Sequence, residues 1–100
     1  MFARVTTGRI QPGMSDELMP LFQSAAHQQQ GMQGFVSTQL LIDRTANTFL
    51  VVTVCQTLAD LEASGTVPRQ VLAEPRVAQA LAGPPAIAVY EVALQVAAQP

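Results

Sequence analysis

Near the middle of the chain stands the segment Phe49-Leu50-Val51-Val52-Thr53-Val54-Cys55, which is apolar at odd and even positions alike. Successive side chains of a β-strand point to opposite faces of a sheet, so this segment predicts a strand that needs cover on both sides. The helices of a chain of 100 residues suffice for one face of such a sheet. We therefore expect a second copy of the protein to lie against the other face.

The composition agrees with a large buried surface. Hydrophobic residues make up 49% of the chain and charged residues only 12%, whereas an average soluble domain has about 25% charged residues. This apolar excess fits a subunit interface, and the length fits a single domain over residues 1–100. No apolar run approaches the roughly 20 residues of a membrane helix, and the N-terminus lacks the apolar core of a signal peptide. We expect a cytoplasmic homodimer that does not bind membranes.

The inventory of charged and metal-binding residues excludes several functions. All five basic residues are arginines spread singly along a chain of net charge -2, so no basic stripe is available for nucleic acid. Without lysine the chain has neither a Schiff-base residue nor a phosphate-loop lysine. One histidine and one cysteine match no metal-ligand spacing. We therefore expect no metal, no cofactor and no nucleic-acid partner.

Periodicity, capping residues and turn residues predict the order of the elements. A first helix is expected from the N-cap Ser15 to the C-cap region at Gly31. Thr57 and Asp60 match a capping box for a short helix, and two prolines divide the next helical region into two pieces. The predicted strands are Phe2–Ile10, Gly34–Asp43, Phe49–Gln56 and Ile87–Val96, and the later helical segments are Leu58–Ala63 and Pro68–Leu81.

This βαββαβ order predicts the fold class. It is the ferredoxin-like α+β arrangement, in which a four-stranded antiparallel sheet carries its helices on one face and the first and third strands are central. Packing two such sheets face to face gives a dimeric α+β barrel.

Three local features resemble the antibiotic biosynthesis monooxygenase family. They are Pro12-Gly13 before an amphipathic helix, Gly34-Phe35 at the start of the second strand, and the strand-to-helix passage VVTVCQTLADL at residues 51–61. The resemblance covers nearly the whole chain in order and spacing, and it implies a dimeric α+β barrel. For the cofactor-free members it implies oxidation of phenols or quinols between the helices and the sheet, where the electron-rich anion of the substrate meets dioxygen.

The chain departs from the family pattern at several functional positions. Many members carry a tryptophan at the end of the third strand, where this chain has Cys55. The haem-degrading members use an asparagine on the first strand and a histidine on the second helical stretch, whereas this chain has Thr6 and no histidine after His27. The resemblance therefore implies chemistry without haem.

The candidate substrate-binding residues come from the first helix and the two central strands. Thr53 and Cys55 share a strand face, and Thr6 lies beside them if the first and third strands are neighbours. Apolar residues on one stripe of the helix form the opposite wall. We predict a substrate pocket made by Thr6, Leu18, Leu21, Phe22, Thr53 and Cys55.

Two residues are weak candidates for catalysis, and each has a purely structural alternative. His27 is the only histidine, the residue type most often used as a general acid or base, but an exposed imidazole near a helix end has no such role. Cys55 is a thiol near a helix start, or a small buried hydrophobic residue. The strand charges Arg4 and Glu91 are expected to pair with each other, in a structural or a substrate-orienting role.

Two functions fit these residues. The first is a cofactor-independent monooxygenase-like enzyme that acts on a small aromatic or quinol-like substrate. The alternative is a non-catalytic dimer that binds a small apolar ligand or serves as an assembly module. A pocket in which several polar groups converge favours the first function, and a pocket filled by core side chains favours the second.

Overall fold

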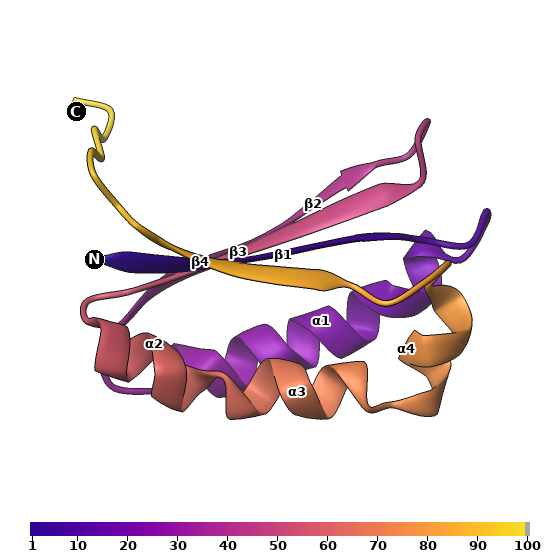
Figure 1. Ribbon diagram of the computed structural model, residues 1–100, viewed down its shortest axis with the longest axis horizontal. Helices are drawn as coiled ribbons and strands as arrows, with labels where there is room; N and C mark the ends of the chain where they lie inside the picture. Colours follow the sequence, from indigo (N-terminus) through magenta and orange to yellow (C-terminus); the bar gives the residue numbers. More distant parts are fainter. Residues whose placement is uncertain (100) are drawn as a thin grey trace.

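The computed structural model describes residues 1–99. No helix in this range is long and apolar enough to cross a membrane. The pieces predicted between Pro68 and Leu81 are present as separate helices. The elements, shown in Figure 1, are β1 (Phe2–Arg9), α1 (Ser15–Gln30), β2 (Phe35–Asp43), β3 (Thr48–Cys55), α2 (Leu58–Ser64), α3 (Thr66–Leu72), α4 (Pro75–Ala80) and β4 (Ala86–Glu91).

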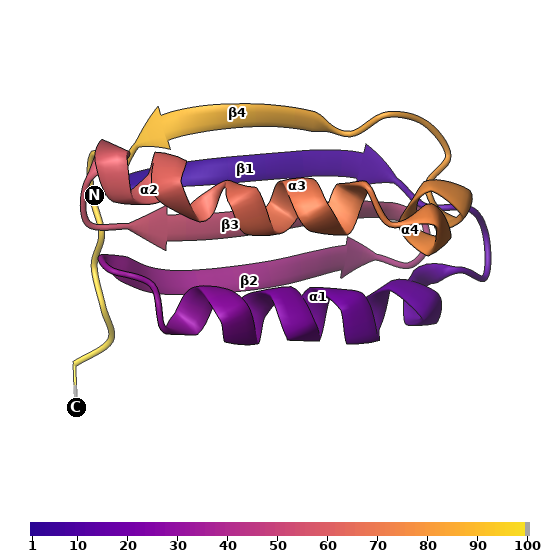
Figure 2. The same ribbon diagram turned by 90° about the horizontal axis from the view of Figure 1, so that it is seen from below.

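The four strands form one antiparallel sheet in the order β2-β3-β1-β4. The predicted α+β ferredoxin-like fold and the central position of the first and third strands are thus confirmed. The helices α1 to α4 lie on one side of the sheet (Figure 1), and α2 and α3 run along the strands, in front of the sheet, when the molecule is seen from that side (Figure 2). Within residues 1–99 no helix covers the other side of the sheet.

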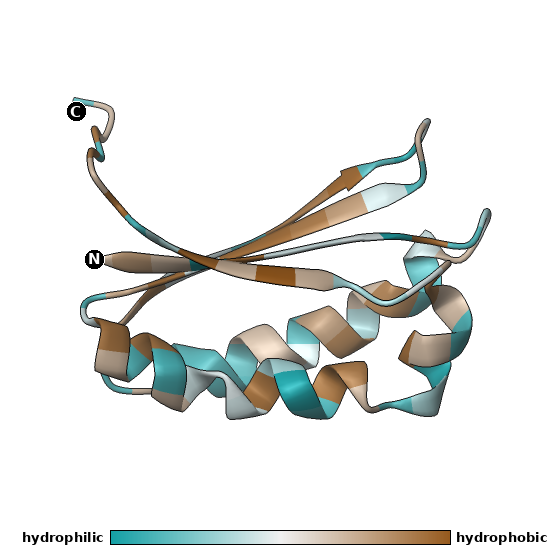
Figure 3. Ribbon diagram, in the orientation of Figure 1, coloured by the Kyte–Doolittle hydropathy of each residue, from teal (hydrophilic) through white to brown (hydrophobic). Residues whose placement is uncertain are grey.

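The strand register assigns each side chain to the helix side or to the uncovered side. Residues paired in an antiparallel ladder share a face, and β1 pairs with β3 through Arg4↔Thr53 and Val5↔Val52. Arg4 and Thr53 face the helices, while Val5 and Val52 belong to the uncovered side, which we call the open face. The strands are largely apolar (Figure 3). The large apolar residues of the open face are Val5, Leu41, Leu50, Val52, Val54 and Tyr90.

The hydrophobic core lies between the helices and one end of the sheet. Its fully buried members are Ile10, Leu18, Phe49, Val77 and Ala80. Gly8 lies opposite Phe49 in the register, and a Cβ atom at Gly8 would come within 2.6 Å of the Phe49 ring. The missing side chain on β1 therefore leaves the space that the ring occupies.

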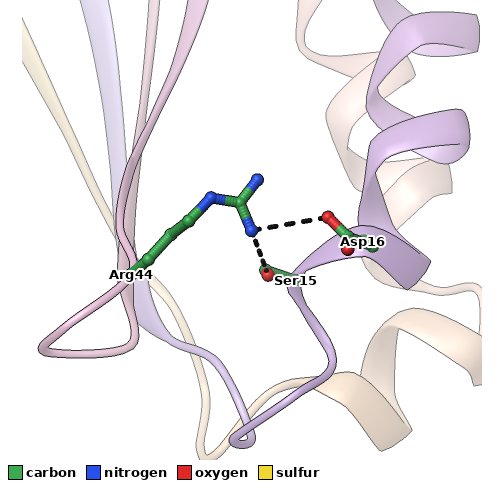
Figure 4. A network of polar contacts seen from close by, with 3 residues as sticks. All are labelled: Ser15, Asp16 and Arg44. Atoms are coloured by element: carbon green, nitrogen blue, oxygen red, sulfur yellow. Dashed lines mark hydrogen bonds and ion pairs between the residues drawn. The ribbon is translucent and has the colours of Figure 1, made fainter.

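The start of α1 differs from the prediction. Met14 is the N-cap residue and makes no side-chain cap, so Ser15 is the first helical residue and not the cap. Its hydroxyl accepts a hydrogen bond of 3.0 Å from the Arg44 guanidinium, which also lies 3.4 Å from the Asp16 carboxylate (Figure 4). These contacts are exposed, so we expect them to contribute at most about 1 kcal/mol to stability.

The last strand is shorter than the predicted Ile87–Val96. It ends at Glu91, which pairs with Phe2 at the start of β1, and one further hydrogen bond joins the Val92 amide to the Met1 carbonyl. Beyond this point β1 offers no backbone partner. Residues 92–99 leave the sheet toward the side opposite the helices (Figure 1), and Leu94 is 82% exposed.

The capping box of α2 is present as predicted, and it gives a first test of the fold. The Thr57 hydroxyl accepts a 3.1 Å hydrogen bond from the Asp60 amide. We expect Thr57→Ala to lower the free energy of unfolding by about 1 kcal/mol, or the melting temperature by about 4–8 °C. Thr57→Ser keeps the acceptor oxygen and is expected to match the wild type in thermal denaturation, as is Thr45→Ala in the exposed hairpin loop. An equal loss in all three variants would contradict a role for the cap.

Candidate functional site

A cavity of about 170 Å³ lies between the sheet and the helices α1 and α3. Its floor is the helix side of β1, β2 and β3, and its walls are the facing sides of the two helices. The residues that line it are Arg4, Thr6, Met19, Phe22, Gln23, Ala25, Ala26, Gln29, Thr38, Leu40, Phe49, Val51, Thr53, Pro68, Val71 and Leu72.

Hydroxyl groups from three neighbouring strands meet on the floor of the cavity. Thr53 on β3 pairs in register with Thr38 on β2 and with Arg4 on β1. The Thr38 and Thr53 hydroxyl oxygens are 2.9 Å apart and share one hydrogen bond. Thr6 lies one step further along the same face of β1, opposite Val51. A ligand over these strands therefore meets several hydroxyl groups and Arg4 on a floor that is otherwise apolar.

One stripe of α1 forms the wall above the floor. Phe22, Ala25 and Gln29 follow one another at helical spacing and all line the cavity. The Phe22 ring packs against Phe49 with 6.0 Å between centroids and a tilt of 44°. Gln29 is only 4% exposed, and within residues 1–99 its side-chain amide makes no hydrogen bond. Along this stripe the cavity therefore has the Phe22 ring at one end and the Gln29 amide at the other.

Arg4 lines the cavity, and its partners differ from the predicted one. The register places Glu91 opposite Phe2 and Val89 opposite Arg4, and within residues 1–99 the expected ion pair of Arg4 and Glu91 is absent. The Arg4 guanidinium instead donates 2.9 Å and 3.0 Å hydrogen bonds to the Leu61 carbonyl and the Ser64 hydroxyl of α2. Arg4 is 7% exposed, so its charged group lies inside the protein.

The surroundings of Arg4 disfavour its positive charge. Burial lowers the pKa of the Arg4 guanidinium, nearby Cys55 opposes that shift, and the positive charge of Arg69 adds to it. An arginine side chain nevertheless stays protonated in proteins, because its ordinary pKa lies so far above neutral. The cavity wall therefore carries a permanent buried cation.

The structure brings together only part of the predicted substrate site. Thr6, Phe22 and Thr53 line the cavity. Leu18 is 1% exposed and belongs to the hydrophobic core, against which Leu21 also packs. Neither is among the residues that line the cavity. Substrate binding by the residues that do line it stays a prediction.

The two weak catalytic candidates lie outside the cavity. Cys55 is completely buried and is not among the lining residues, because the cavity ends before this last residue of β3. This position suits a small hydrophobic core residue. His27 lies in the last turn of α1 and is exposed. Neither side chain reaches a ligand that fits within the cavity.

Sequence reasoning missed several lining residues. Gln29 was detectable in principle, because it continues the stripe of Leu18, Phe22 and Ala25 as a polar residue at an apolar position. Thr38 was detectable as the register partner of Thr53 once the hairpin was aligned. The lining residues of α3 had no signal of their own, since their orientation depends on how that helix packs against α1.

Solved structures with the same fold are known, although no protein-family model matches the chain and no curated protein matches its sequence. Rv0793 from Mycobacterium tuberculosis has a TM-score of 0.79 at 14% identity, over 96% of this chain and 98% of that one. A candidate antibiotic biosynthesis monooxygenase from Caulobacter crescentus has a TM-score of 0.77 at 20% identity, over 93% and 90%.

A third similar structure is the heme-degrader MhuD from Mycobacterium tuberculosis, with two hemes bound in its active site. Its TM-score is 0.73 at 23% identity, over 97% of this chain and 100% of that one. The predicted resemblance to antibiotic biosynthesis monooxygenases is therefore confirmed at the level of the fold. At these identities the comparison describes the fold and not the activity.

The residues that line the cavity do not fit a haem. Its volume of about 170 Å³ is close to the roughly 150 Å³ of an engineered cavity that binds benzene. The porphyrin ring of haem is much larger than benzene and does not fit in this volume. The only histidine of the chain, His27, is exposed on α1. Residues 1–99 also contain no cluster of three or more histidine, cysteine, aspartate or glutamate side chains that could hold a metal ion.

Proposed function

We propose that the protein binds a small aromatic or quinol-like molecule in this cavity and acts on it as a cofactor-independent monooxygenase. The observation that carries the proposal is the cavity itself, which has the volume of about one aromatic ring and is lined by Phe22 and Phe49. The converging groups of Thr6, Thr53 and Gln29 supply the few polar contacts that orient a ligand in such a site.

The proposed reaction needs no external reductant. A hydroquinone and dioxygen would give a hydroxybenzoquinone and water: one oxygen atom enters a ring C–H bond as a hydroxyl group, and the other takes two hydrogens from the hydroquinone and leaves as water. The substrate supplies all the electrons that reduce dioxygen. The role of the chain is then to orient the ring, to stabilise the anion that forms when a hydroxyl group loses its proton, and to exclude bulk water.

We also propose that the protein is a homodimer in which the open faces of two sheets pack together. The centre of the open face is formed by Val5, Leu50, Val52 and Val54 from the two middle strands. Tyr90 on β4 and Leu41 on β2 flank this centre and are 57% and 50% exposed. A sheet face this apolar associates in water, and a second copy matches it by symmetry.

A variant that fills the cavity tests the proposed function. Ala26 lines the cavity from α1, so Ala26→Leu is expected to place a larger side chain inside it and to weaken hydroquinone binding at least about tenfold in calorimetry. Alanine and leucine both favour helices, so the fold is expected to persist. The matched control is Ala78→Leu on the exposed side of α4, which should bind as the wild type does.

Oxygen uptake separates the two functions that fit the sequence. The wild type is expected to consume dioxygen with hydroquinone faster than hydroquinone does in buffer alone, and Ala26→Leu is expected to lose this difference. Binding without oxygen uptake would instead identify the protein as a non-catalytic ligand-binding module. Unchanged binding in a folded Ala26→Leu variant would place the site elsewhere and overturn the proposal.

A further inference from the structure

We propose that the ligand of the cavity carries an oxyanion, a carboxylate or a phenolate on a single aromatic ring, and that Arg4 binds this group. The inference rests on the proposed function, because it names the substrate class of the same cavity. It is carried by a buried cation without an anionic partner in a cavity whose polar groups are otherwise hydroxyls and amides.

Arg4 lacks the partner that a buried charge ordinarily has. Within residues 1–99 the only ion pair joins Arg44 to Asp16, at the opposite end of α1 from Gln29. The two groups that Arg4 does contact, the Leu61 carbonyl and the Ser64 hydroxyl, are neutral. Charged side chains are seldom this buried unless they are paired, so a guanidinium with only neutral partners suits an anionic ligand.

The helix α2 compensates the Arg4 charge only in part. Leu61 lies near the C-terminal end of α2, where the unpaired carbonyl groups of a helix carry roughly half a negative charge. This arrangement explains how the fold tolerates the buried cation. It also leaves net positive charge on the guanidinium, which has five N–H donors and uses two of them in these contacts.

A second cation lies close to the first. A Cβ atom at Gly65 would be 3.4 Å from one guanidinium nitrogen of Arg4 and 3.8 Å from one of Arg69. Both groups therefore reach toward the same point, at the junction of α2 and α3. Arg69 is exposed and is not among the lining residues, so its charge adds only a solvent-screened attraction for an anionic ligand near Arg4.

The other polar groups of the cavity suit an oxyanion as well. No aspartate or glutamate is among the lining residues that the structure describes. Gln29 lines the cavity, and its side-chain amide has two N–H donors to offer to a ligand there. Thr6 adds a hydroxyl donor on the floor, and so does whichever of Thr38 and Thr53 accepts the hydrogen bond between them. A ligand oxyanion thus meets donors and positive charge but no like charge.

The first test compares two ligands of nearly equal shape. At neutral pH 4-hydroxybenzoate is an anion and 4-hydroxybenzamide is neutral, so the ratio of their dissociation constants measures the preference for charge. We expect calorimetry on the wild-type protein to show at least about tenfold tighter binding of 4-hydroxybenzoate, because a charge-assisted contact to a buried guanidinium is stronger than a neutral one.

Two variants assign this preference to Arg4. Arg4→Met keeps a side chain of similar length without charge, and is expected to reduce the ratio of dissociation constants to about one while circular dichroism still shows the fold. Arg4→Lys keeps the charge and is expected to retain a preference for the anion. The matched control is Arg76→Met on α4, which removes the same charge from an exposed position outside the cavity and should leave the ratio unchanged.

A spectroscopic titration of the wild type needs no variant and tests the phenolate separately. Bound 4-nitrophenol is expected to give the absorbance of its phenolate at a lower pH than the free dye does, because the cation stabilises the ionised form. A lowered pKa in 4-nitrophenol without a preference for 4-hydroxybenzoate assigns the site to phenolates, and the reverse result assigns it to carboxylates.

The possible failures are distinguishable. If hydroquinone and 4-hydroxybenzamide bind as tightly as 4-hydroxybenzoate and the dye is unshifted, the cavity is a ligand site but the oxyanion inference is wrong. If none of these molecules binds, the proposed function fails and the inference fails with it. A ratio that is equal in the wild type and in a folded Arg4→Met variant would also overturn the role of Arg4.

Discussion

A glutamate in place of Val52 is expected to convert a dimer of the protein into folded monomers. Val52 lies on the open face of β3, between Val5 of β1 and Gln39 of β2. In the proposed dimer this side chain is near the centre of the interface, so Val52→Glu would bury two unpaired carboxylates. Burying a charge without a partner costs several kcal/mol, and we expect the dissociation constant to rise at least about a hundredfold.

Light scattering coupled to gel filtration measures this change directly. The chain has a mass of 10.6 kDa, and we expect the wild type to elute with twice that mass at micromolar concentration and Val52→Glu with the single mass. The matched control is Ala78→Glu, which adds the same charge to an exposed position of α4 and is expected to remain a dimer. Wild-type protein that stays monomeric and soluble at tens of micromolar would refute the proposed interface.

The fold was predictable from sequence because strands and helices have different periods. In the segment 49–55 apolar residues occupy odd and even positions alike. These positions point to opposite faces of a strand, so the segment alone predicts a sheet that is covered on both sides. The capping pair Thr57 and Asp60 marked the start of α2 by a contact that is local in sequence. The end of β4 was not predictable in this way, because it depends on where β1 begins to offer a partner.

The candidate site was only partly predictable. Helical spacing shows which residues share one face of a helix, but not which part of the protein each of them contacts. Leu18 and Phe22 belong to the same stripe of α1, yet Leu18 packs into the core and Phe22 lines the cavity. The same holds for β3, where Thr53 lines the cavity and Cys55, on the same face, lies beyond its end. Where a cavity begins and ends depends on the angle and distance between packed elements, which no local pattern encodes.

For Arg4 the sequence indicated an unusual residue, a charge within an apolar strand, but not the groups that this charge contacts. A charge within an apolar strand predicts an oppositely charged partner. The sequence indicated Glu91, because the last strand was expected to lie beside the first. The register places Glu91 opposite Phe2, so it is offset from Arg4 along the same face, while α2 brings the Leu61 carbonyl within 2.9 Å of the guanidinium. The contact therefore depends on the packing of α2 against the sheet.

Phe49→Ala is expected to destabilise the protein far more than the loss of a helix cap or of a surface charge does. Phe49 is 3% exposed, belongs to the core and packs against Phe22 at the boundary of the cavity. Truncating a buried phenylalanine costs about 3–5 kcal/mol, which corresponds to a fall in melting temperature of roughly 12 °C or more. Denaturant unfolding at one fixed protein concentration measures the loss, since dimer formation would make stability depend on concentration.

A double-mutant cycle with Gly8 tests the physical reason for this effect. The space for the Phe49 ring exists because Gly8 has no side chain: a Cβ there would lie 2.6 Å from the ring. Gly8→Ala alone is therefore expected to cost about 1–3 kcal/mol through overpacking. In the Phe49→Ala background the added methyl group meets no ring, so the same change should cost less than about 0.5 kcal/mol. Two losses that simply add would show that the glycine and the ring are energetically independent, against the packing described for them.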